Sequence, residues 1–321
     1  MSVTSSARPV VPERITSPER IVADLRQQAH TRIVIALLVV SAIKQIVHAL
    51  IYPPFQGHDE VAHLGYLRVL AEEQRIPTFS DTLPRALERY SSFTLDWPAL
   101  YTANHPPLYY IISWPAYQLA GDGFLSQLYA VRLVAIPLFL LVVWLSYLLA
   151  RTLFPHDDFL MVTIPSVVAF QPQLSFEGAI VNNDMLSIVF ATLVLYLCAR
   201  ALRHGLSHRL ALSLGVALGL GLLSKATLTS FVPIVAVVAL YCGWPRPAAR
   251  VRDAQWWRAN LERAGLLVAP VILLSLPWYL YLRRTYGDFT AFEATRELQS
   301  DWNRPAGSFR ELLLSSEFHL E

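Results

Sequence analysis

Apolar runs that reach or approach the length of a membrane span recur along this chain. The clearest lie at 33–52, 131–149, 228–242 and 266–282, and roughly 20 apolar residues carry a helix across the hydrocarbon layer. Hydrophobic residues make up 54% of the 321 residues and charged residues only 16%, whereas soluble domains carry about 25% charged residues. The sequence therefore predicts an all-α, polytopic helical bundle in a membrane, and we expect no nucleic-acid partner.

The positions of the arginines predict the orientation of this bundle, because Lys and Arg concentrate in cytoplasmic loops. Arginines crowd the N-terminal segment 1–29 and the loops 199–210 and 244–264. Placing all three inside requires about seven spans and leaves 105–121 in the outer interface. That location suits a short run with an internal proline and with Tyr and Trp residues. If 105–121 instead crossed as a short tilted span, the later arginines would lie outside.

This topology divides the chain into three expected parts. Residues 1–29 form a cytoplasmic tail, 30–285 form a membrane module of about seven spans, and 286–321 form a segment on the outer face. The first outer loop, 53–130, is expected to carry two interfacial helices. We expect the plasma membrane as the location, with the functional site facing the outside or the periplasm.

Ionisable residues gather where the first apolar run ends, in the stretch PPFQGHDEVAHLGY. Residues 59–74 fit an amphipathic helix, on which Asp59 and His63 share a face and Glu60 points away. A carboxylate suits the first turn of a helix, so capping is the simplest structural explanation of Asp59. Capping does not explain why His58, Glu60 and His63 crowd beside it at a membrane surface.

Three kinds of chemistry compete for this cluster. A zinc hydrolase needs H-E-x-x-H, and here DEVAH has Asp where the first His belongs. A di-carboxylate metal site built on Glu60-x-x-His63 needs a second copy on another helix, which the sequence lacks. Glycosyl transfer from a lipid-linked phosphosugar fits better. Its phosphate leaving group needs no general acid, unlike glycoside hydrolysis, and a single carboxylate takes the proton of the acceptor hydroxyl.

For that reaction Asp59 is the candidate base. Cations must stabilise the departing phosphate, and Lys225, Arg283 and Arg284 are the candidates. Lys225 lies in SKAT at the expected outer end of a helical pair, where snorkelling is the structural alternative.

Further candidates complete the predicted site. Asp184 in VNNDML either caps a span or supplies a second carboxylate facing Asp59. His105, in HPPLYY, is a substrate-binding candidate. Asp184 and His63 are expected to orient substrate or to hold a divalent cation, Mg²⁺ or Mn²⁺, for which Asp59 and Asp184 are the ligand candidates.

Six motifs follow one another between about residues 53 and 288: HDEVAH, HPPLYY, VRL, NND, SKAT and PWYLYLRRTYGD. In this order they resemble the GT-C superfamily of polyprenyl-phosphate-sugar-dependent glycosyltransferases, in particular its protein O-mannosyltransferase and aminoarabinose-transferase branches. The resemblance implies a conserved module of about seven spans with two interfacial helices in the first outer loop. It also implies that Asp59 is the catalytic base and that Glu60 assists acceptor or metal binding.

Two departures from the family pattern matter. The mannosyltransferase branch has a basic residue soon after HPP, where this chain has Tyr109 and Tyr110, so the donor sugar stays open. Family members tend to continue into further spans and a soluble domain. We therefore expect this chain to be truncated to, or minimal around, the conserved module.

The sequence thus predicts an inverting membrane glycosyltransferase. It would move a sugar from a polyprenyl-phosphate donor to a cell-envelope acceptor, which is a glycan, a lipid or a protein. A transporter or flippase of lipid-linked intermediates is the alternative from another class, but it would be expected to show internal repeats and broken helices. A non-catalytic subunit that binds lipid phosphate is a third possibility.

Overall fold

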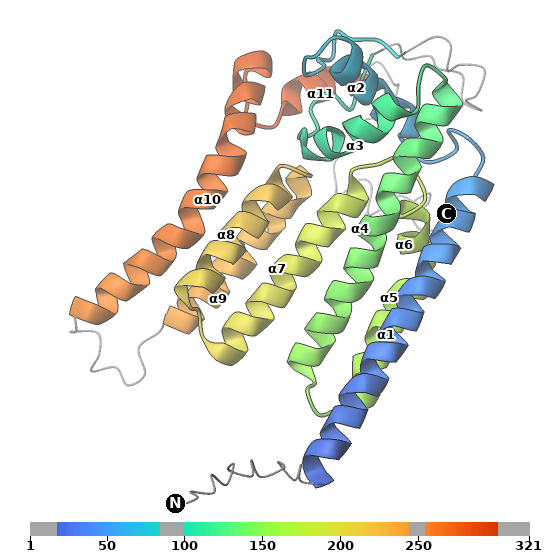
Figure 1. Ribbon diagram of the computed structural model, residues 1–321. Coiled ribbons are helices and arrows are strands. Elements are labelled where there is room, and N and C mark those ends of the chain that lie inside the picture. The colour runs from blue at the N-terminus through green and yellow to red at the C-terminus, as the bar shows by residue number, and fades with distance from the viewer. Residues whose placement is uncertain (1–17, 84–98, 244–253, 301–321) are drawn as a thin grey trace, which may run out of the picture.

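The computed structural model describes residues 18–83, 99–243 and 254–300, and the regular structure within these ranges is helical (Figure 1). Only an isolated bridge between Thr82 and Ala99 has β character there. The helices are α1 Pro18–Ile51, α2 Glu60–Glu72, α3 Leu108–Leu119, α4 Phe124–Leu153, α5 Asp158–Phe170, α6 Pro172–Glu177, α7 Asp184–His204, α8 His208–Leu222, η2 Ala226–Ser230, α9 Phe231–Gly243, α10 Ala254–Tyr286 and α11 Phe292–Ser300. The predicted all-α class is confirmed.

Among the described residues, five helical stretches are long and apolar enough to cross a membrane: Gln28–Ile51, Phe124–Leu153, Asp184–His204, Ala226–Gly243 and Ala254–Tyr286. The helices α5 and α8 are apolar but shorter. Large apolar side chains such as Ile43, Leu240 and Leu273 stay exposed on the long helices, which is where lipid would cover them. The chain is therefore a multi-pass membrane protein.

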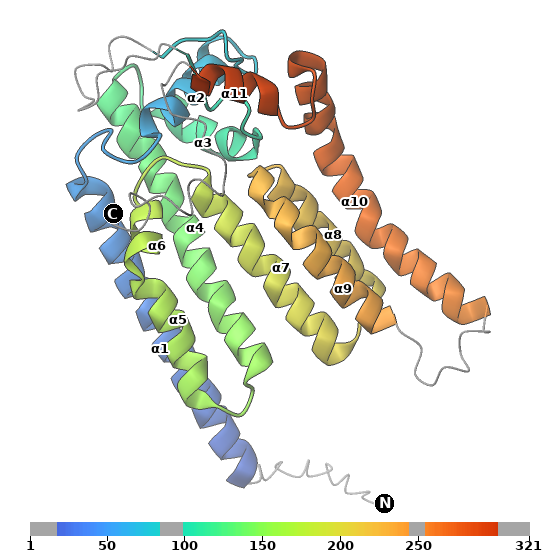
Figure 2. The same cartoon turned by 180° about the vertical axis from the view of Figure 1, so that it is seen from behind.

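The long helices lie side by side, and α2, α3 and α11 gather at one end of the bundle (Figures 1 and 2). The described N-terminal end of α1 lies at the opposite end. Glycines allow α8 and α10 to approach each other closely. A Cβ on Gly215 would lie 2.2 Å from the carbonyl oxygen of Leu267, and one on Gly219 would lie 3.0 Å from that of Pro270. Small residues at such crossings are typical of membrane helix packing.

The apolar run 159–174, which about seven spans require as one continuous crossing, is interrupted in the structure. The helix α5 ends at Phe170, Gln171 is extended (φ −65°, ψ 123°), and α6 begins at Pro172. Proline has no N–H and disfavours helical geometry in the residue before it, so Pro172 favours a break at Gln171. Lys44 of α1 reaches this break, where its ammonium donates to the carbonyl of Ala169 and to Ser175 Oγ (2.6 Å).

A buried ion pair joins several segments at the end of the bundle where α2 and α3 lie. Glu60 of α2 and Arg132 of α4 are fully buried, and Arg132 Nε and Nη2 lie 2.8 and 2.7 Å from the two carboxylate oxygens. The other guanidinium N–H groups donate to the carbonyls of Ala49, Tyr52 and Pro53 at 2.8–3.0 Å. All five N–H donors of the guanidinium therefore have acceptors.

The carboxylate of Glu60 is equally well occupied. The backbone N–H groups of Gly57 (3.2 Å) and Val181 (2.9 Å) also donate to its oxygens. Gly57 is needed at this approach, because a Cβ there would lie 2.7 Å from Glu60 Cγ. Buried charges are tolerated when they are paired and fully hydrogen-bonded. The pair thus fixes the end of α1, the start of α2, α4 and the loop before α7 relative to one another.

Replacing Glu60 by Gln should destabilise the protein strongly, because the buried guanidinium loses its counter-charge. We expect the free energy of unfolding to fall by about 3–5 kcal/mol, measured as a lower thermal midpoint of the detergent-solubilised protein. Glu72→Gln is the matched control, since Glu72 pairs with Arg68 at 3.0 Å on the surface and exposed pairs contribute about 1 kcal/mol or less. Equal midpoints for the two variants would contradict this role of the buried pair.

Candidate functional site

Asp59 lies on the turn that leads into α2. The predicted helix 59–74 is observed as Glu60–Glu72, with Asp59 as its N-cap residue in the left-handed region (φ 60°, ψ 5°). Its side chain makes no capping hydrogen bond, so the capping explanation does not hold. The carboxylate is exposed, and Oδ1 accepts a hydrogen bond from the Tyr101 hydroxyl at 2.9 Å. Left-handed geometry is rare outside glycine and often marks functional positions.

Behind Asp59, His63 and His105 belong to a buried aromatic layer. His63 Nδ1 lies 2.8 Å from the Tyr110 hydroxyl, and the two imidazole rings are 5.5 Å apart. Tyr110 stacks on Tyr66 with ring centroids 3.5 Å apart. Burial lowers the pKa of His63 well below its usual value, and burial together with the charge of Lys225 lowers the pKa of His105 to about 4. Both imidazoles are therefore neutral at physiological pH.

Asp184 and Lys225 form an ion pair across the start of α7. Lys225 Nζ lies 2.5 Å from Asp184 Oδ1, and both side chains are about three-quarters buried (24% and 28% exposed). Asp184 does not cap α7, because the amide oxygen of Asn182 accepts the N–H groups of Asp184 (3.0 Å) and Met185 (3.3 Å). Lys225 does not snorkel away from the protein. The ion pair with Asp184 keeps its ammonium group within the protein.

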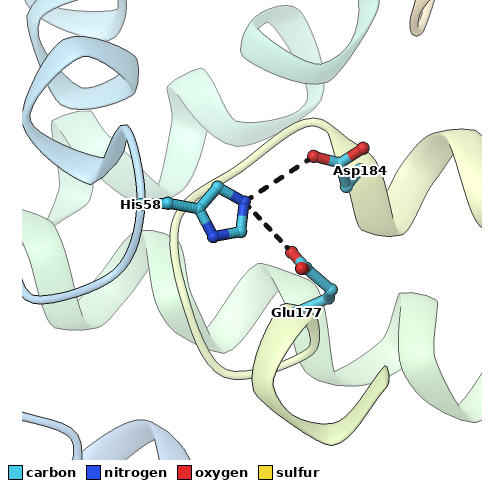
Figure 3. A group of neighbouring side chains, drawn as sticks. All are labelled: His58, Glu177 and Asp184. Atoms are coloured by element: carbon cyan, nitrogen blue, oxygen red, sulfur yellow. Dashed lines mark ion pairs between the residues drawn. The ribbon is translucent and has the colours of Figure 1, made fainter. Parts of the chain in front are cut away.

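His58 and Glu177 join this pair, although sequence reasoning did not place them in the site (Figure 3). His58 Nε2 lies 3.5 Å from Glu177 Oε2 and 3.9 Å from Asp184 Oδ2. The carboxylate of Asp184 raises the pKa of His58 against partial burial, with a smaller contribution from Glu177. Burial raises the pKa of Glu177. The sequence feature that could have indicated Glu177 is the stretch SFEGAIVNND, in which Glu177 lies one short loop before Asp184.

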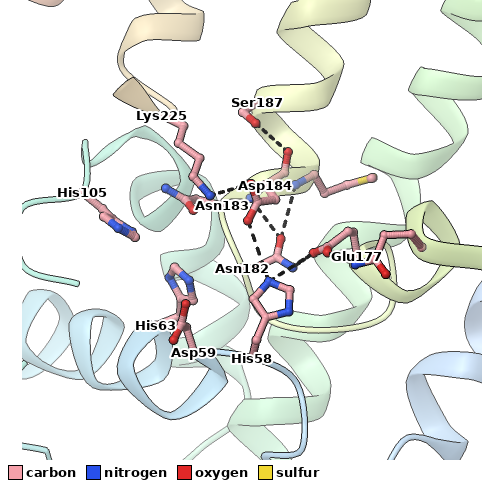
Figure 4. A network of polar contacts seen from close by, with 12 residues as sticks. His58, Asp59, His63, His105, Glu177, Asn182, Asn183, Asp184, Ser187 and Lys225 are labelled. Atoms are coloured by element: carbon pink, nitrogen blue, oxygen red, sulfur yellow. Dashed lines mark hydrogen bonds and ion pairs between the residues drawn. The ribbon is translucent and has the colours of Figure 1, made fainter. Parts of the chain in front are cut away.

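These groups come from separate segments and converge on one region (Figure 4). The turn before α2 supplies His58 and Asp59, the end of α6 supplies Glu177, and the segment after α8 supplies Lys225. The predicted residues Asp59, His63, His105, Asp184 and Lys225 are thus brought together. Glu60 is not: its carboxylate is turned into the buried pair with Arg132.

Arg283 and Arg284 lie apart from this group. Both are exposed near the end of α10, and the Arg283 guanidinium lies 4.9 Å from the centroid of the Phe289 ring. Among the described residues, no hydrogen bond or ion pair joins either arginine to His58, Glu177, Asp184 or Lys225. The last turns of α10 instead pack near the loop after α2, where Tyr286 Oη accepts the N–H of Phe79 at 3.3 Å.

Comparison with known proteins decides the family. Residues 104–278, more than half of the chain, match the family model PMT_2, described as dolichyl-phosphate-mannose-protein mannosyltransferase. The chain belongs to this family. PMT_2 is a GT-C family of membrane glycosyltransferases that use a lipid-phosphate mannose donor, so the predicted resemblance is confirmed. No curated protein and no solved structure matches the chain.

The family match covers only part of the candidate site. It begins just before His105 and includes Glu177, Asp184 and Lys225. Asp59 lies outside the matched residues. The family match therefore supports a glycosyltransferase reaction and carries no information on the role of Asp59.

The neutral histidines make stability sensitive to acid. The folded-state pKa of His105 lies below the unfolded value of about 6.5, so the unfolded chain binds more protons below that pH and stability falls as the pH drops toward 4. In His105→Gln, the loss of unfolding free energy between pH 6.5 and 4 should be smaller by about 1–3 kcal/mol, measured from thermal midpoints in detergent. His208→Gln is the control, because His208 is exposed on α8. An unchanged slope in His105→Gln would contradict a buried neutral imidazole.

Proposed function

We propose that this chain transfers a sugar from a polyprenyl-phosphate donor to a cell-envelope acceptor on the outer face of the plasma membrane. The acceptor is a glycan, a lipid or a protein, and the transfer inverts the anomeric centre. The observation that carries the proposal is the exposed Asp59 carboxylate, which lies beside a cluster of charged groups at one end of a membrane bundle. The family membership gives the reaction class.

The proposed topology has seven spans. The five long helical stretches supply five, and α8 and the α5–α6 pair supply the other two. At 1.5 Å per residue, the 13 residues of α5 cover about 20 Å, and α6 extends the crossing beyond the break. The short helices α2 and α3 then lie in the interface. Ile111, Ile112 and Trp114 of α3 are exposed, as an interfacial helix requires.

Charge supports the proposed orientation. Arg200, Arg203 and Arg209 lie around the turn between α7 and α8, at the end of the bundle opposite α2 and α3 (Figures 1 and 2). Arg258 and Arg263, in the first turns of α10, share that end. Positive residues mark the cytoplasmic side, so the candidate site faces outward.

Asp59 is suited to act as the general base. Tyr101 engages Oδ1 of its carboxylate, and among the described contacts Oδ2 has no partner. In the proposed reaction Oδ2 accepts the proton of the acceptor hydroxyl as the oxygen bonds to the anomeric carbon, and the lipid phosphate leaves. Such a base contributes about 10²–10⁴ in rate.

Lys225 is the proposed partner of the departing phosphate. One of its N–H groups is directed to Asp184, and the ammonium has two further donors. Arg283 and Arg284, at the end of α10, are proposed to bind the phosphate of the donor. His63 and His105, being neutral, are proposed to position substrate through ring contacts and not through charge. Glu60 stays a predicted catalytic residue, but its surroundings favour holding Asp59 in place.

The two alternatives make different predictions. A flippase would move a labelled polyprenyl-phosphate lipid across a liposome without forming a new glycoside. A lipid-phosphate-binding subunit would bind the donor without transfer or movement. The exposed carboxylate of Asp59, in the same region as Lys225 (Figure 4), favours group transfer over both alternatives, because neither alternative needs a base.

Asp59→Asn should lower sugar transfer by a factor of about 100 or more, because the amide cannot accept the proton. The measurement is transfer from a panel of radiolabelled polyprenyl-phosphate sugars, mannose first, by the purified chain in liposomes. Glu73→Gln removes an exposed carboxylate at the opposite end of α2 from Asp59 and should leave transfer unchanged. Equal transfer by wild type and Asp59→Asn would remove Asp59 from the chemistry.

A further inference from the structure

We propose that His58, Glu177 and Asp184 form a binding site for a divalent transition-metal ion such as Zn²⁺. One ligand atom from each residue, a nitrogen and two carboxylate oxygens, lies within 4.8 Å of the others (Figure 3). The ligands come from the turn after α1, the end of α6 and the start of α7. This set differs from the sequence prediction, which paired Asp184 with Asp59.

The separations suit a shared ion better than direct hydrogen bonds. Two ligands bound tetrahedrally at about 2.0–2.2 Å from zinc lie roughly 3.3–3.6 Å apart. His58 Nε2 lies 3.5 Å from Glu177 Oε2 and 3.9 Å from Asp184 Oδ2. A protonated imidazole that simply paired with a carboxylate would approach to about 2.7–2.9 Å. The nitrogen instead lies between two carboxylate oxygens, and all three ligand atoms lie within 4.8 Å of one another.

The carboxylate of Glu177 is already oriented by its neighbours. Asn182 Nδ2 donates to Oε2 at 2.5 Å and Gln173 Nε2 donates to Oε1 at 2.7 Å. Lys225 holds the other oxygen of Asp184, leaving Oδ2 toward His58. Hydrogen bonds of this kind orient the ligands in metal sites and tune their affinity. The mixture of imidazole and carboxylates favours zinc-like ions over Ca²⁺ or Mg²⁺.

The site is open on one side, as a catalytic metal site must be. The side chain of His58 is 44% exposed, whereas that of Glu177 is 11% exposed. A fourth position therefore faces outward from three protein ligands, the pattern of zinc sites that bind substrate. Glu177 also lines a cleft of ≈ 350 Å³, whose apolar walls include Val167, Leu174 and Ile188.

The natural occupant of the fourth position is an oxygen of the donor phosphate, an assignment that rests on the proposed function. A metal there would neutralise the charge that develops as the phosphate leaves. Lys225, bound to the same aspartate, would add a second positive charge on that side. The prenyl chain would lie along the apolar cleft beside Glu177.

Metal content tests the site without any transferase assay. The tag-free full chain in detergent, stripped with chelator and dialysed against Zn²⁺, should retain one equivalent per chain, and Zn²⁺ should raise its thermal midpoint. His58→Gln and Glu177→Gln, which keep side-chain size, should lower the affinity at least tenfold and abolish the thermal shift. Wild type that retains no zinc, or variants that bind as wild type does, would overturn the proposal.

Two controls separate this site from surface binding and from the proposed reaction. His208→Gln removes another His–Glu pair, with Glu262 at 3.3 Å on the surface, and should keep the full equivalent. Asp59→Asn should also bind zinc normally while losing sugar transfer, so a failed base assignment leaves the metal result intact. Loss of zinc in His208→Gln and not in His58→Gln would place the metal at the surface pair and refute the site.

The phosphate assignment has its own readout. Tetrahedral Co²⁺ is visible by its absorption, so the Co²⁺-loaded chain can be titrated with farnesyl phosphate, a short lipid phosphate. We expect a change in the Co²⁺ spectrum that saturates, and no change with farnesol, which lacks the phosphate. A spectrum that farnesyl phosphate leaves unchanged would overturn the phosphate as the fourth ligand.

Discussion

The arrangement at the α2 end of the bundle depends on one buried ion pair, between Glu60 and Arg132. Desolvating two charges costs several kcal/mol each, and only complete hydrogen bonding makes such a pair tolerable. Here every guanidinium N–H has an acceptor, and both carboxylate oxygens accept backbone N–H groups as well. The ion pair therefore supplies hydrogen bonds that water would otherwise make. It does so at a point where four segments meet without regular backbone hydrogen bonding between them.

Two adjacent acids in the sequence consequently have opposite environments. Glu60 is turned inward and fully buried, which anchors the start of α2. Asp59, one residue earlier, is left on a left-handed turn with its carboxylate exposed. The proposed base has to be held rigidly and still be reachable by a substrate. Glu60, buried in the ion pair, fixes the start of α2, and Asp59 remains exposed beside it.

Much of the fold could be predicted, because hydropathy and arginine placement reflect the membrane directly. The helices, the short α3 and the position of Asp59, Asp184 and Lys225 at one end follow from these local signals. Two of the three ligands of the proposed metal site could not be predicted in this way, since His58 and Glu177 meet only through folding of distant segments. The partner of Glu60 was equally hidden, because Arg132 is 72 residues away. The break before Pro172 was not predicted, although its cause, the proline, is local in the sequence.

The break between α5 and α6 supplies the hydrogen-bond acceptors of Lys44, which links this lysine to the order in which the helices assemble. Its ammonium donates to Ala169 and Ser175 beside the interrupted helix, 125 and 131 residues later in the chain. A lysine in an apolar span is unfavourable by about 3 kcal/mol when it enters the bilayer alone. Because α1 precedes α5 and α6 in the chain, it is synthesised first, and the acceptors that satisfy Lys44 follow only with these later helices. The contact that satisfies the backbone at the break therefore also makes the stable placement of α1 depend on α5 and α6.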